Sequence, residues 1–184
     1  MRIRIALAVV LSLAGCGKPA ATRAITPQKM ADALYAVLAA DRAVYAHEVV
    51  ERLQDQEGVI RASEHYKDDR ALPLPAQMFR LGAEAARRTS GGVTYSLLSP
   101  WPINTQNAPR TEVEKAGLRR AAETGQSSYA PESLGGERYF TAVYPDKAVS
   151  EACAACHNAH RDSPRHDFKV GDVMGGVVIR IPVE

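Results

Sequence analysis

The residues most able to do chemistry in this chain are Cys153-Ala154-Ala155-Cys156-His157, a C-x-x-C-H sequence. Two thiols at this spacing can add to the two vinyl groups of a porphyrin, and the next histidine is then held against one face of the iron. We therefore expect one covalently attached haem c, with Cys153 and Cys156 as the thioether residues and His157 as the proximal iron ligand. A zinc site completed by His160 is the competing interpretation, although structural zinc usually takes two separated ligand pairs.

The third cysteine, Cys16, lies at the end of an N-terminal sequence typical of export. A basic start precedes an apolar run, and Leu13-Ala14-Gly15-Cys16 resembles a bacterial lipobox. We predict that residues 1–15 form a lipoprotein signal peptide that is removed, that Cys16 is lipidated, and that residues 16–25 form a tether. The apolar run is too short to span a membrane. The alternative is an ordinary cleaved signal that happens to end in a cysteine.

Export and haem attachment agree on the compartment, because c-type haem is attached outside the cytoplasm. We therefore expect a lipid-anchored protein on the periplasmic side of a bacterial membrane, with the choice between inner and outer membrane left open. The formal net charge is only +2 and does not suggest a nucleic-acid partner. The length that remains after the signal peptide predicts one domain, residues 26–184.

A long first helix is expected to hold one side of this domain. Thr26 is a suitable N-cap, Pro27 suits the first helical position, and the helical pattern continues to about Gln56. Apolar residues recur at helical spacing and are expected to face the core. They are Leu34, Val37, Leu38, Val44, Tyr45, Val49 and Leu53.

The later sequence predicts two more helices and a few strands. Pro75 begins a helix that ends near Gly91-Gly92, and the capping box Thr111 to Glu114 begins another that ends near Gly125. Strands are expected at 93–98, in a hairpin around Gly135-Gly136, and at 177–183. Because the helices come mostly first and the strands mostly last, we predict an α+β fold with an antiparallel sheet.

Several blocks along the chain together resemble the PAS-like monohaem c-type cytochrome family. They are Ala40 to Tyr45, Leu74 to Ala76, Ser99 to Asn104, Cys153 to Asn158 and Lys169 to Gly175. The resemblance implies a PAS-like antiparallel sheet with flanking helices, a long N-terminal helix beside it, and one covalently attached haem. It also implies that Cys153, Cys156 and His157 hold this haem.

The resemblance leaves the distal iron ligand open. One described family member uses a cysteine thiolate on the first helix, and this chain has no cysteine left for that position. Tyr45 is the nearest match, and tyrosinate can ligate haem iron, but Tyr45 also fits the apolar pattern of its helix. The other candidates, each with a simpler packing or surface explanation, are His47, His65, Met78, Met174 and His160.

Two classes of function follow from these residues. The first is an electron-transfer cytochrome that passes single electrons between periplasmic or membrane partners. The second is a haem-based redox or gas sensor that signals through a separate partner protein. An enzyme is the weakest alternative, since a peroxidase needs a distal acid-base histidine and a charge-stabilising arginine. His65 with Arg61 or Arg70 could fill these roles, but nothing in their spacing requires it.

Overall fold

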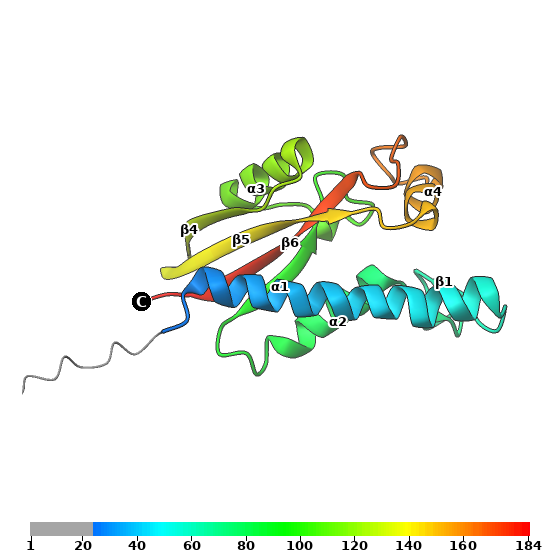
Figure 1. The fold of residues 1–184 in the computed structure, drawn as a ribbon, viewed down its shortest axis with the longest axis horizontal. Helices are drawn as coiled ribbons and strands as arrows, with labels where there is room; N and C mark the ends of the chain where they lie inside the picture. The colour runs from blue at the N-terminus through cyan, green and yellow to red at the C-terminus, as the bar shows by residue number, and fades with distance from the viewer. Residues whose placement is uncertain (1–23) are drawn as a thin grey trace, which may run out of the picture.

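The computed structural model describes residues 24–184 (Figure 1). The predicted signal peptide, the predicted lipidation site Cys16 and most of the predicted tether lie outside these residues. Within them, a four-stranded antiparallel sheet has the order β3-β6-β5-β4. The strands are β3 (Thr94–Leu98), β4 (Ser128–Leu134), β5 (Glu137–Lys147) and β6 (Val173–Pro182).

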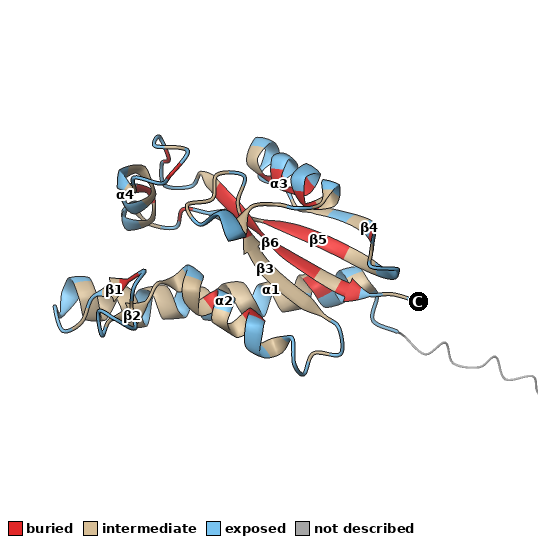
Figure 2. Ribbon diagram, turned by 180° about the vertical axis from the view of Figure 1, so that it is seen from behind, coloured by how far each residue is buried: buried red, intermediate tan, exposed pale blue. Residues whose placement is uncertain are grey.

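Helices cover both faces of this sheet. Alternate residues of β6 point to opposite faces, so Ile179 packs with Ala31 and Phe79 on one side, whereas Val178 packs with Leu118 on the other. The first side is covered by α1 (Pro27–Val44) and α2 (Pro75–Ala86), and the second by α3 (Glu112–Thr124). Figure 2 shows the buried residues concentrated along β5 and β6 between these layers. The predicted α+β class, with a long N-terminal helix and flanking helices, is confirmed.

The first helix begins and ends where the sequence predicted. Thr26 caps it by accepting a hydrogen bond from the Lys29 backbone N–H at 3.2 Å, and α1 continues into a π-helical segment, η1 (Tyr45–Gln56). The expected inward direction of Val37 and Val44 is wrong, because both side chains are 59% exposed. The helix carries apolar residues on two faces, and periodicity alone cannot tell which of them is buried.

The predicted ends of α3 and the predicted turn between β4 and β5 are confirmed. Thr111 and Glu114 form the capping box of α3, and Gly125 ends this helix with a φ of 67°. Gly135 and Gly136 have φ values of 59° and 87° at the β4–β5 turn, a conformation that favours glycine at both positions. A short 3₁₀ helix, η2 (Thr105–Asn107), lies in the proline-rich loop before α3.

One feature between η1 and α2 was not predicted. Strands β1 (Ala62–Ser63) and β2 (Leu72–Pro73) form a small parallel pair beside the end of the long helix. The remaining helix, α4 (Glu151–Ala159), lies between β5 and β6 and contains the C-x-x-C-H sequence. Among residues 24–184, none of the helices is both long enough and apolar enough to cross a membrane.

Three buried charges lie between α3 and the sheet. Arg180 on β6 donates hydrogen bonds of 2.7 Å both to Glu114 on α3 and to Glu132 on β4. Thr141 donates to the same Glu132 oxygen at 2.8 Å, while the second oxygen, Oε1, is buried and has no partner within the described residues. The two carboxylates therefore depend on one guanidinium group.

Candidate functional site

The cysteines and histidine of the C-x-x-C-H sequence occupy one side of α4. Residues three and four positions apart in a helix share a face, so Cys156 and His157 both lie one turn beyond Cys153. Both thiols are free; Cys153 is half-buried and lies 3.3 Å from the Ser150 hydroxyl, whereas Cys156 is exposed. The helix thus presents two unpaired thiols with a histidine beside them.

His157 is oriented with one ring nitrogen inward. Its Nδ1 atom is buried without a hydrogen-bond partner, and its ring meets the edge of Phe168 with the ring centroids 6.0 Å apart. No hydrogen bond engages Nε2 within residues 24–184, and this atom is not among the buried unpaired ones. Burial lowers the pKa of His157, and His160 adds to this effect while Asp146 opposes it. The ring is therefore neutral at neutral pH, which is the state that binds a metal.

A small apolar cluster holds α4 in place. Ala154 on its inner side packs with Ala148, Phe168 and Met174, and Cys153 lies against this cluster. The Asn158 side chain fixes the following loop, because it donates to the Phe168 carbonyl at 2.8 Å and accepts from the Phe168 N–H at 2.9 Å. The inner side of the helix is packed; Cys153 borders this packed side, whereas Cys156 is exposed.

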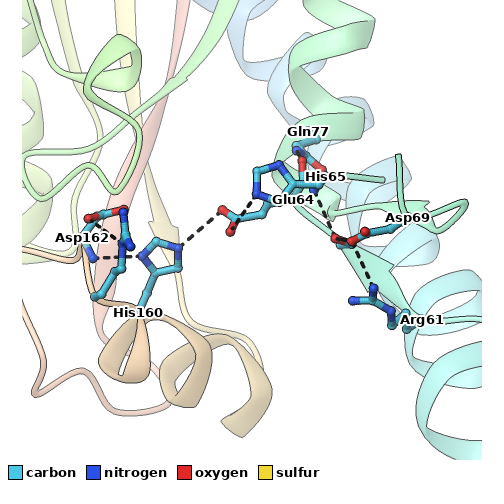
Figure 3. Close-up of polar contacts among 9 residues, drawn as sticks. Arg61, Glu64, His65, Asp69, Gln77, His160 and Asp162 are labelled. Atoms are coloured by element: carbon cyan, nitrogen blue, oxygen red, sulfur yellow. Dashed lines mark hydrogen bonds and ion pairs between the residues drawn. The ribbon is translucent and has the colours of Figure 1, made fainter. Parts of the chain in front are cut away.

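The loop after β1 reaches α4 from the opposite direction, as Figure 3 shows. His160 Nε2 lies 3.4 Å from a Glu64 carboxylate oxygen, and His160 Nδ1 accepts the Asp162 backbone N–H at 3.1 Å. Because Nδ1 is an acceptor, the neutral ring carries its proton on Nε2 and donates it to Glu64. Gln77 of α2 holds the same loop by donating to the Glu64 carbonyl at 2.7 Å.

This loop also affects the thiols. The pKa of Cys156 is raised first by burial, then by the neighbouring Cys153 and by the Glu64 carboxylate. Asp146, which influences His157 from the end of β5, forms an ion pair with Arg42 of α1. The charged surroundings of Cys156 and His157 therefore include Glu64, in the loop after β1, and Asp146, at the end of β5.

The candidates for a distal ligand are found in different surroundings. Tyr45 donates its hydroxyl hydrogen to the Pro73 carbonyl at 2.7 Å, and burial raises its pKa, so its oxygen is an engaged neutral phenol. His47 is exposed and lies 2.7 Å from Glu51 on the same helix. His65 has a side chain that is 71% exposed.

The two methionines differ from each other. Met174 is 8% exposed and belongs to the apolar cluster beneath α4, on the side of Phe168. It therefore packs on the same side as the inward edge of His157. Met78 is half-buried in the first turn of α2, next to Gln77, and none of the three buried clusters of the described residues contains it.

Among the described residues, the structure does not support the zinc alternative. Among residues 24–184 there is no group of three or more His, Cys, Asp or Glu side chains arranged to hold a metal ion, and His160 contacts Glu64 instead. Arg61, one of the arginines imagined beside His65, pairs with Asp69 at 3.1 Å. The donor set on α4 suits thioether attachment and one axial nitrogen, with the departure that Nδ1 of His157 lacks the acceptor usual for a ligating histidine.

The sequence predicted a role for Cys153, Cys156 and His157 of α4 but gave no indication of three residues around them. Glu64, Asp146 and Phe168 carry no motif, and their positions become meaningful only after strands β1, β5 and β6 are arranged. The inward edge of His157 gave no signal in the sequence either.

An antiparallel sheet between two helical layers, with a C-x-x-C-H helix inserted before the last strand, defines the class of this protein. The chain belongs to the Tll0287-like family, whose model matches residues 21–182. Among solved structures it is similar to one described as the cyanobacterial heme-protein Tll0287, with a TM-score of 0.55 and 17% sequence identity. That alignment covers 86% of this chain and 97% of the other. No curated protein sequence matches.

Proposed function

We propose that this protein is a lipid-anchored monohaem c-type cytochrome that transfers single electrons between periplasmic or membrane partners. The observation that carries the proposal is the arrangement on α4, where two free thiols and the unengaged nitrogen of His157 follow one another within a single turn. The solved relative is described as a haem protein, which supports the choice of cofactor.

The protein residues have three tasks in this proposal. Cys153 and Cys156 would each form a thioether bond, and His157 would supply an axial nitrogen to the iron. The packing of Ala154 and Phe168 keeps α4 against the sheet, so the ligand ring has little freedom to rotate. The haem would supply the one-electron couple, and the protein environment tunes its potential through the axial ligands and nearby charges.

Met78 is the favoured candidate for the distal side. It lies on α2 beside the loop that contacts α4 through Glu64 and His160, and it has no other identified role. A thioether ligand raises the reduction potential and suits an electron carrier. An open or displaceable distal position instead permits the binding of a small gas and favours the sensor alternative.

Covalent attachment is tested by replacing the thiols. We expect Cys153→Ser with Cys156→Ser to lose all haem that survives denaturing electrophoresis, whereas Cys16→Ser, the matched control, retains it. Haem staining that persists in the double variant contradicts the proposal.

The electron-transfer function is tested by visible spectra of the oxidised and reduced protein, with and without carbon monoxide. We expect low-spin spectra that carbon monoxide leaves unchanged, and a high-spin spectrum for Met78→Ala. Tyr45→Phe and Met174→Leu serve as matched controls that keep the low-spin spectrum. A prompt Soret shift with carbon monoxide in the unsubstituted protein favours the sensor instead.

A further inference from the structure

The outward face of α1 is almost free of charge. Exposed surface helices usually carry polar residues outward, but here a single charged side chain, Asp41, lies among the exposed residues between positions 30 and 44. The exposed residues of this stretch are Met30, Ala33, Ala36, Val37, Ala40, Asp41, Ala43 and Val44. Figure 1 shows α1 in front of the sheet with no other described element over it.

The large side chains on this face have a regular spacing. Met30, Val37 and Val44 are 43%, 59% and 59% exposed and recur every seven residues. Ala33 and Ala40 lie between them, at the second apolar position of the same heptad. A repeat of seven with apolar residues at two positions is the pattern by which two helices pack together. We call this surface, residues 30 to 44 on the exposed side of α1, the outer seam.

The helix cannot turn to bury the outer seam within its own fold. Its opposite face is already occupied, because Ala31, Leu34 and Leu38 pack against the sheet, and Asp32 accepts hydrogen bonds from Tyr129 and Tyr144. No other segment of residues 24–184 covers the seam.

The charges at the two ends of the seam favour a second copy in the opposite direction. Lys29 lies exposed at one end and Glu48 at the other, and neither forms an ion pair within the described residues. In an antiparallel pair centred on Val37, Lys29 of each copy comes within about one helical turn of Glu48 of the other. A parallel pair would instead bring each like charge next to itself.

We propose that this protein forms an antiparallel homodimer through the outer seam, with Val37 at the twofold axis and Met30 facing Val44 across it. A contact of this kind is self-complementary, as a twofold interface requires. The proposal does not rest on haem binding or on electron transfer, because the C-x-x-C-H helix lies elsewhere in the fold.

Disulfide cross-linking of the full-length chain in the cells that produce it tests both the interface and its direction. We expect Val37→Cys to form a covalent dimer on mild oxidation, since two copies of this residue meet at the axis. Val44→Cys alone should give little product, whereas coexpression of Met30→Cys and Val44→Cys chains should give a mixed dimer. Val59→Cys is the matched control, because Val59 is 69% exposed but lies outside the seam.

Each result of this experiment has a defined meaning. Cross-linking of Val37→Cys no greater than that of Val59→Cys overturns the proposal. Stronger cross-linking of Val44→Cys than of Val37→Cys overturns the antiparallel arrangement, because it indicates a parallel pair. Haem staining of the same gels monitors the proposed function separately, so a failure of one is not mistaken for a failure of the other.

A second experiment uses mass measurement by light scattering on purified full-length protein in detergent. We expect a dimer for the unsubstituted chain and for Val59→Glu, and a monomer for Val37→Glu with unchanged circular dichroism. Lys29→Glu should raise the dissociation constant at least several-fold, and adding Glu48→Lys should restore it. The dimer is overturned if the unsubstituted protein is monomeric. If, in addition, the Cys16→Ala protein binds anionic or neutral vesicles and loses this binding when Val37 is also substituted, the seam is assigned to a lipid surface.

Discussion

At the scale of single residues, Arg180 determines whether two buried carboxylates are tolerated. Its guanidinium group contacts Glu114 and Glu132, whose side chains are 7% and 5% exposed. Burial alone raises the pKa of Glu132, but the hydrogen bonds from Arg180 and Thr141 contribute to a net downward shift. The charged form of Glu132 is therefore the one that stabilises the fold.

This arrangement predicts a particular dependence of stability on pH. A carboxylate with a lowered pKa contributes stability above its ordinary pKa, and the contribution is lost as the pH falls through the folded value. We expect the free energy of unfolding to decrease below about pH 4.5. Arg180→Met should lower the free energy of unfolding by about 3–5 kcal/mol at neutral pH, because it leaves buried charge unpaired. On acidification, this variant should lose less stability than the unsubstituted protein does. Urea unfolding between pH 3 and 7 measures both effects.

The control for this prediction is Arg120→Met, which removes an exposed arginine of α3, the helix that packs over Arg180. It should change the free energy of unfolding by less than about 0.5 kcal/mol. An Arg180→Met protein with the same stability and the same pH profile as the unsubstituted chain would contradict the assigned role.

Cys156 allows a second test at this scale. Burial, Cys153 and Glu64 all raise the pKa of its thiol, so its thiolate is scarce at neutral pH in protein made without haem. We expect Glu64→Gln to lower the pH midpoint for alkylation of Cys156, because it removes the carboxylate while burial and Cys153 remain. Mass spectrometry of the peptide that carries both cysteines measures this midpoint. Glu137→Gln, a distant exposed carboxylate, should leave it unchanged, and an equal midpoint in both variants would refute the contribution of Glu64.

At the scale of elements, the close approach of α3 to the sheet depends on Gly117. A Cβ at this position would lie 2.5 Å from Val143 Cγ2 and 2.8 Å from the Ser128 hydroxyl. Gly to Ala normally stabilises a helix by about 1 kcal/mol. Here we expect Gly117→Ala to destabilise the protein by about 1–3 kcal/mol, because the helix must move away from β5.

The neighbouring exposed residue provides the comparison. Ala116→Gly should cost about 1 kcal/mol from helix propensity alone. Thermal or urea unfolding of both variants tests the packing argument. The argument is wrong if the Gly117→Ala protein is more stable than both the Ala116→Gly protein and the unsubstituted chain.

The sequence predicted elements well where a local signal defines their ends. Thr26, the Thr111–Glu114 capping box and Gly135-Gly136 each specify a cap or turn through hydrogen bonds to near neighbours. The π-helical η1 and the β1–β2 pair have no such local signature, because each depends on contacts with distant segments. Val37 was assigned to the wrong side for a related reason, since only the assembled sheet determines which apolar face of α1 is inward.

At the scale of the whole molecule, the contacts described for α4 come from residues 24–184, whereas the predicted lipidation site is Cys16. Helix α4 is held by Ala148, Phe168 and Met174, all within residues 24–184, and the Phe168 ring contacts His157. The residues of the C-x-x-C-H sequence could be named as candidates from their spacing alone, whereas the surroundings of Met78 could not, because they depend on the packing of α2 beside the Glu64 loop.

This separation predicts that anchoring and haem attachment can be uncoupled. We expect Cys16→Ala to lose incorporation of labelled fatty acid and to move from the membrane to the soluble periplasmic fraction. Each buried methylene of an acyl chain contributes about 0.8 kcal/mol to membrane affinity, so loss of the lipid removes most of the binding. The covalent haem and its visible spectrum should be unchanged, because the domain that would carry them is intact. Continued fatty-acid labelling of the variant would refute lipidation at Cys16, whereas loss of haem without loss of export would show that the N-terminal segment contributes to the attachment site.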